Sequence, residues 1–146
     1  MKITDKWIQA KTPCQEALDW WDKKERDSSI ILKKLIAENL LDWANWLVVR
    51  VMTKEQKVKY AIYAAESVIG IYEKKYPDDD RPRKAIQATK KYLKNKSAKN
   101  KHAAAAYAAA AAYAAAAAAY DAADAAAKKE MLLKVLNYGI KLLKIR

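Results

Sequence analysis

A run of alanine between residues 103 and 127 constrains this chain more than any other feature. Twenty of these 25 residues are alanine, and the others are Tyr107, Tyr113, Tyr120, Asp121 and Asp124. Alanine has the highest helix propensity of all residues, so the run predicts one long helix of about 37 Å at 1.5 Å per residue. Because methyl groups let neighbouring backbones approach closely, we expect this helix to form the centre of a bundle.

The remaining composition favours helices as well. The chain has 146 residues, the size of one domain, and contains only two Gly and three Pro, whereas strands joined by tight turns need many of both. No segment shows sustained alternation of apolar and polar residues. We therefore predict an all-α fold. Residues 1–146 would form one compact bundle of six or seven helices around the alanine-rich helix.

The first predicted amphipathic helix begins near a Thr-Pro pair. Thr12 would be its N-cap, Pro13 its first residue, and Gln15 the reciprocal partner of a capping box. Cys14 and Trp21 fall on its apolar face at helical spacing.

Similar signals mark where four more amphipathic helices begin. These signals are Ser28 or Ser29, the break at Asn39, Thr53 with Gln56, and Pro82. A further amphipathic helix is expected over residues 128–146.

The net charge of +12 lies entirely in the second half of the chain. Residues 1–80 contain 14 basic and 14 acidic side chains, whereas residues 81–146 contain 15 basic and three acidic ones. This asymmetry indicates either an acidic or polyanionic partner or a solvated face, and lysine suits non-specific contact with nucleic acid phosphates. The candidate binding surface is Lys84, Lys90, Lys91, Lys94, Lys96, Lys99 and Lys101.

Four charged residues from separate segments form a second candidate site. Asp42 and Glu66 lie beside apolar residues, and Arg81 and Arg83 begin a later helix. Carboxylates and guanidinium groups are buried only when they are paired, so we expect a buried cluster that joins three helices. The alternative is a small-ligand or enzyme site at the same four residues.

Other residues give weaker indications of chemistry. Cys14 and His102 could form a thiol–imidazole pair, but a core cysteine and a solvated histidine are favoured. Asp78–Asp80 suit helix capping better than cation binding. We expect no catalysis, no metal and no cofactor.

The chain offers little for insertion into a membrane. Residues 1–5 carry no apolar signal-peptide core, and Asp121 and Asp124 interrupt the alanine run. With a single cysteine, these features predict a cytoplasmic protein. A homodimer would follow if aromatic side chains of the alanine helix or of the first helix were exposed.

Four motifs, taken in order, resemble one known family. They are TPCQEALDW at 12–20, LLDWANWL at 40–47, AAE at 64–66 and DDDRPRKAI at 78–86, followed by the Ala/Tyr run. Over about residues 12–127 the chain resembles small, alanine-rich bacterial and phage proteins described as immunity proteins. The resemblance implies a helical interaction protein that would bind a toxin or host-defence protein and block its active surface.

Overall fold

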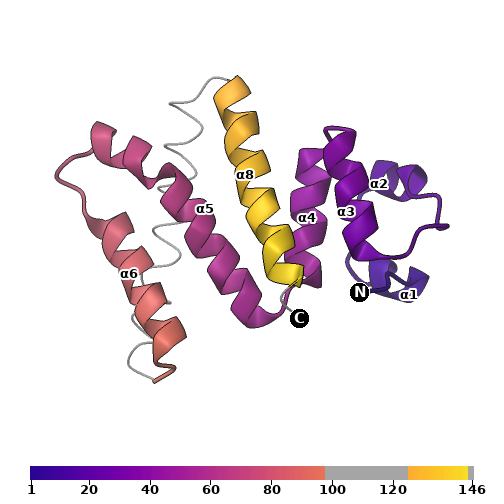
Figure 1. Ribbon diagram of the computed structural model, residues 1–146, viewed down its shortest axis with the longest axis horizontal. Helices are drawn as coiled ribbons and strands as arrows, with labels where there is room; N and C mark the ends of the chain where they lie inside the picture. Colours follow the sequence, from indigo (N-terminus) through magenta and orange to yellow (C-terminus); the bar gives the residue numbers. More distant parts are fainter. Residues whose placement is uncertain (98–124, 145–146) are drawn as a thin grey trace.

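A computed structural model describes residues 1–97 and 125–144 of the chain (Figure 1). In these residues the helices are α1 Asp5–Gln9, α2 Gln15–Trp20, α3 Ser28–Ala37, α4 Leu41–Val51, α5 Lys54–Lys75, α6 Arg81–Lys94 and α8 Ala125–Lys144. Their only β pairing is an isolated antiparallel bridge between Lys2 and Asp27. The all-α prediction is therefore confirmed. Most of the alanine run lies outside the described residues, so its expected position at the centre of the bundle stays a prediction.

The described helices lie in a row whose order differs from the order in the chain (Figure 1). From one end it runs α6, α5, α8, α4 and α3, and α1 and α2 lie beyond α3. The C-terminal helix α8 packs against both α4 and α5, although α4 and α5 are consecutive in sequence. Among the described helices, α8 therefore holds the centre.

A glycine allows α8 to reach this position. A Cβ atom at Gly139 would lie 2.7 Å from Cε2 of Tyr60 and 3.0 Å from Cγ2 of Val48, both closer than ordinary contacts. One turn earlier, Leu136 is completely buried in the main apolar cluster. Glycine is thus required because the α8 backbone approaches side chains of α4 and α5 directly.

The aromatic residues are divided along the chain. All five tryptophans lie between residues 7 and 46, whereas all nine tyrosines lie at residue 60 or later. The helices α1–α4 therefore form a tryptophan-rich end of the row, and α5, α6 and α8 carry tyrosine.

The start of α2 differs from the prediction. The helix begins at Gln15, and Cys14 is its N-cap with an extended backbone, so Cys14 is exposed instead of buried on the apolar face. Thr12 has a φ of 45° and cannot begin the helix. The Gln15 side chain donates to Asp19 Oδ1 at 2.8 Å and does not complete a capping box.

The other predicted starts agree more closely with the structure. Thr53 and Gln56 form the expected capping box, Asn39 breaks the chain with a φ of 60°, and Pro82 lies in the first turn of α6. Asp27, one residue before the predicted serines, caps α3 by accepting from the Ser29 amide. The short helix α1, capped by Thr4, was not predicted.

Candidate functional site

The candidate surface lies on a hairpin of α5 and α6 at one end of the row (Figure 1). The seam between the two helices contains a small apolar cluster. Ile62 and Ile69 of α5 and Ile86 of α6 are buried there, with Val58 and Leu93 packed against them. Apolar residues on one face of each helix thus fix which face of α6 remains outside.

Ion pairs flank this apolar seam. Arg83 Nη2 lies 2.6 Å from Glu73 Oε2, and Lys90 Nζ lies 2.5 Å from Glu66 Oε1. The partners step by seven residues along each helix, in opposite directions, as an antiparallel pair with one register requires. These pairs are about half exposed, so each stabilises the fold only modestly.

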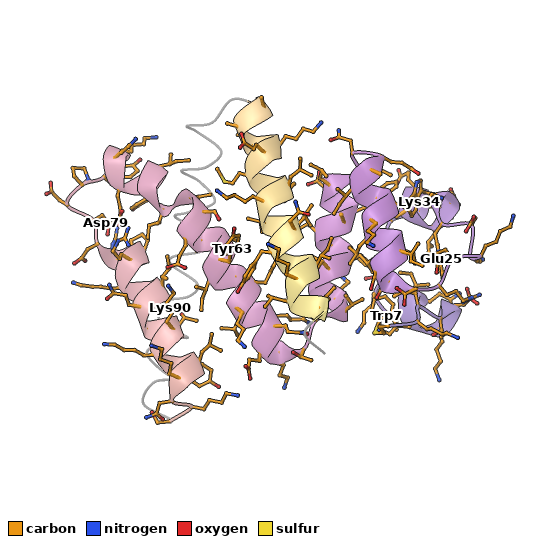
Figure 2. The ribbon with its side chains drawn as sticks, viewed as in Figure 1. Trp7, Glu25, Lys34, Tyr63, Asp79 and Lys90 are labelled. Atoms are coloured by element: carbon orange, nitrogen blue, oxygen red, sulfur yellow. The ribbon has the colours of Figure 1, made fainter. Side chains whose placement is uncertain are left out.

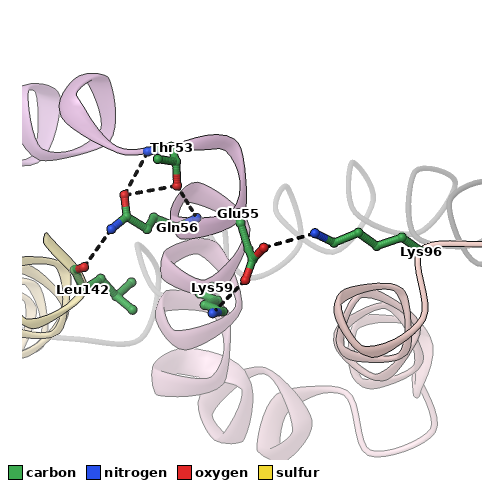
Figure 3. A network of polar contacts seen from close by, with 6 residues as sticks. All are labelled: Thr53, Glu55, Gln56, Lys59, Lys96 and Leu142. Carbon is green, nitrogen blue, oxygen red and sulfur yellow. Dashed lines mark hydrogen bonds and ion pairs between the residues drawn. The ribbon is translucent and has the colours of Figure 1, made fainter. Parts of the chain in front are cut away.

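A third contact closes the open end of the hairpin (Figure 3). Glu55 accepts from Lys96 at 3.1 Å and lies 2.9 Å from Lys59 Nζ. These hydrogen bonds with Lys59 and Lys96 lower the pKa of Glu55. Next to it, the Gln56 amide donates to the carbonyl oxygen of Leu142 at 2.7 Å. The first turn of α5 is therefore connected to the segment that follows α6 and also to α8.

Asp79 organises the turn between α5 and α6 (Figure 2). Asp79 accepts from Arg81 Nη2 and from the Tyr72 hydroxyl, both at 2.6 Å, and also from the Arg81 amide at 3.1 Å. The Arg81 and Tyr72 bonds hold the pKa of Asp79 far below its ordinary value, and the bond to Asp79 raises the pKa of Tyr72. Asp80 occupies the N-cap position without a side-chain cap bond and instead pairs with Lys84 at 2.8 Å.

The four residues expected to form one buried cluster are placed separately. Arg81 pairs with Asp79, Arg83 with Glu73, and Glu66 with Lys90, while Asp42 is exposed in the first turn of α4. The expected burial is wrong, since the Arg81 side chain is 77% exposed. The reason is that acids of α5 and of the turn lie nearer to these arginines than the acid of α4. A ligand site at these residues stays a prediction.

The predicted lysine surface is divided by the same ion pairs. Lys84, Lys90 and Lys96 contact Asp80, Glu66 and Glu55, and Lys99 and Lys101 lie outside the described residues. Lys91 and Lys94 are exposed, and neither forms an ion pair within residues 1–97 and 125–144. They are three residues apart on α6, so they share its outer face.

Glu55 and Glu73, which pair with Lys96 and Arg83, were not among the predicted site residues. A signal was present, because Glu66 and Glu73 are seven residues apart and so are Arg83 and Lys90. Matching acidic and basic spacings on consecutive helices indicate an antiparallel ladder of ion pairs.

The described residues contain neither a group of metal ligands nor a helix that could span a membrane. No three His, Cys, Asp or Glu side chains there are grouped to hold a metal ion. Cys14 is exposed, and its possible partner His102 lies outside these residues. None of the described helices combines the length and apolarity needed to cross a bilayer.

Comparison with known proteins identifies a family but no individual relative. Residues 48–144 match a family model described as Imm-5 like putative immunity protein. Searches of curated proteins and of solved structures find no significant match. The match begins at Val48, so two of the four motifs lie before it, but it includes α5, α6 and α8. Because it covers more than half of the 146 residues, the chain belongs to this family of immunity proteins.

Proposed function

We propose that this protein is a cytoplasmic, non-catalytic inhibitor that binds a toxin or defence protein through the outer face of α6. One observation carries the choice of surface. The other basic side chains of residues 81–97 contact acids of α5 or of the turn, whereas Lys91 and Lys94 have no acidic partner among the described residues. Their charge is available to a partner, which supports an acidic docking surface on that partner.

The charge of the hairpin also suits this role. Residues 54–97 contain twelve basic and six acidic side chains, and the acids at 55, 66, 73, 79 and 80 are used in ion pairs within the hairpin. A partner that approaches α6 therefore meets an excess of positive charge. Such complementarity acts mainly on the association rate and on selectivity.

Charge reversal on two matched helical pairs tests the proposal. The partner is first isolated from the native host by a pull-down with the unaltered chain. The readouts are then growth on co-expression and association kinetics at low salt. We expect Lys91→Glu with Lys94→Glu to slow association by about tenfold or more and to weaken protection. The control, Lys54→Glu with Lys57→Glu, has the same spacing and charge change on exposed positions of α5. Equal losses in both variants would assign the effect to net charge and contradict the α6 surface.

Nucleic acid is the second candidate partner, favoured by the same two lysines. A salt series with generic duplex DNA separates the two functions, because each phosphate contact contributes a slope of about −0.9 to log K against log salt. If α6 binds DNA, the Lys91→Glu, Lys94→Glu variant reduces that slope by about two. An absence of binding at low salt rejects this function.

A further inference from the structure

A small apolar cavity lies at the tryptophan-rich end of the row, where α1, α2, α3 and α4 meet. Its volume is about 50 Å³. All the side chains that line it are apolar, and they include Leu18, Trp20, Trp21, Ile31, Trp43 and Trp46. Its lining residues lie between Ile3 and Leu47, and none of them belongs to α6, so the cavity is separate from the proposed docking surface.

The indole N–H groups of two wall residues are satisfied by protein acceptors. Trp20 Nε1 donates to Glu38 Oε2 at 2.6 Å, and Trp21 Nε1 donates to the Glu25 carbonyl at 2.7 Å. Within the described residues, no buried side-chain nitrogen or oxygen lacks a partner. The wall therefore offers an occupant mainly apolar contact area.

The aromatic walls are also held in place by their neighbours. Trp20 and Trp43 meet edge to face with centroids 6.3 Å apart, and Lys34 Nζ lies 4.9 Å from the centroid of Trp20. On the next wall, the Arg50 guanidinium lies 3.9 Å from the centroid of Trp46. Such contacts fix ring orientation before a ligand arrives, which reduces the entropy lost on binding.

One side of the cavity is formed by two short helices, α1 and α2. The helices α1 and α2 have five and six residues, and neither contains a buried residue. Thr12 and Lys23, on either side of α2, have φ values of 45° and 61°. A β-branched residue is rarely found in this left-handed region.

From these observations we propose that the cavity binds the uncharged aliphatic end of a small molecule. A cavity of 150 Å³ with apolar walls binds benzene, so a space of about 50 Å³ admits only the last few carbon atoms of a chain. Because the lining is predominantly apolar, a charged or hydrogen-bonding group would lose its hydration with little compensation. Any polar group of the ligand therefore remains outside the cavity.

A series of normal alcohols from ethanol to hexanol tests the chemistry and the size of this site. The full chain is titrated with each alcohol, and the indole ¹⁵N–¹H resonances are followed. We expect affinity to rise about fourfold per methylene, equivalent to about 0.8 kcal/mol, and to level off when the cavity is full. Shifts should concentrate on Trp20, Trp21, Trp43 and Trp46, which line the cavity, and should be small for Trp7, which does not. Equal shifts of all five indoles, or affinity that rises without a limit, would overturn the proposal.

Three variants relate binding to the cavity itself. Ala17 lines it, so Ala17→Leu should weaken binding of the best alcohol at least tenfold, whereas Ala37→Leu, at an exposed position of α3, should leave it unchanged. If Ala17→Leu does not fold, Leu18→Ala provides the opposite change, since enlarging the cavity should move the limit to a longer alcohol. A limit that stays the same in Leu18→Ala would reject the site.

Discussion

The two sides of α5 are attached to the rest of the molecule by different physical means. Toward α8, it joins a large apolar cluster that includes the fully buried Leu136 and also contains residues of α3 and α4. Toward α6, it offers only a cluster of three buried isoleucines flanked by exposed ion pairs. Apolar burial supplies most of the stability of a fold, whereas exposed ion pairs mainly select one register. We infer that α6 is the more easily detached element, and it carries the proposed binding surface.

The largest effect on stability is expected when equivalent apolar side chains are removed from the α8 side and from the α6 side of α5. Leu136→Ala should cost about 3–5 kcal/mol of unfolding free energy, because Leu136 is fully buried and its neighbours cannot easily fill the cavity. Ile86→Ala should cost about 2 kcal/mol, since its cluster is small and lies near solvent. Chemical denaturation gives both values. Equal costs would show that α6 is as firmly attached as α8.

The next test uses the two glycines of the chain, both in helices. Gly139→Ala should destabilise by about 1–3 kcal/mol, because the new methyl group meets the Tyr60 ring and Val48. Gly70→Ala is the matched control, since the added carbon would meet no atom within 4 Å apart from the neighbouring backbone of its own helix. It should stabilise α5 by up to about 1 kcal/mol through helix propensity. Thermal unfolding of both variants provides the comparison, and a neutral Gly139→Ala would argue against the close approach of α8.

Tyr60 lies on the side of α5 that faces α8, where its ring packs in the large apolar cluster and its hydroxyl group forms a hydrogen bond. The ring is buried, the hydroxyl donates to Asn45 Oδ1 at 2.7 Å, and burial raises the pKa of Tyr60 to about 12. Tyr60→Phe should cost about 1 kcal/mol at neutral pH through the lost hydrogen bond.

The pKa of Tyr60 also predicts how the variant responds to alkali. The unfolded state ionises first, near pH 10, so the stability that Tyr60 provides is complete below pH 10 and is lost as the pH rises toward 12. Stability curves over this range should therefore converge for the two proteins. A constant difference between them would contradict the raised pKa.

The smallest expected effect lies in the ion pairs of the hairpin. Glu66→Gln removes the partner of Lys90 and should speed exchange of the α6 amides by up to about fivefold, with little change in global stability. Added salt should produce a similar change in the unaltered protein. Glu130→Gln, at an exposed acid of α8, is the control and should leave α6 unaffected. Unchanged exchange of the α6 amides in Glu66→Gln would show that the ion pair between Glu66 and Lys90 does not help to hold α6 in place.

Local signals in the sequence predicted most helix starts, but not the arrangement of the helices. Thr53, Gln56 and Asn39 act through neighbouring backbone, and the structure confirms them. The placement of α8 depends on the close approach at Gly139, which a helical pattern does not reveal. The arginines were assigned to the wrong acids for the same reason, because pairing depends on tertiary register. The resemblance found the correct family, although the matched residues begin at Val48 and not near Thr12.

The division of aromatic residues provides two separate optical reporters within one chain. Emission excited at the long-wavelength edge of indole absorption comes only from residues 7–46, while phenol signals come only from residues 60–138. A loss of α6 alone would therefore leave the indole spectrum unchanged and alter only the phenol signal. Melting curves from the two chromophores should coincide if the row of helices unfolds as one unit and separate if the hairpin opens first.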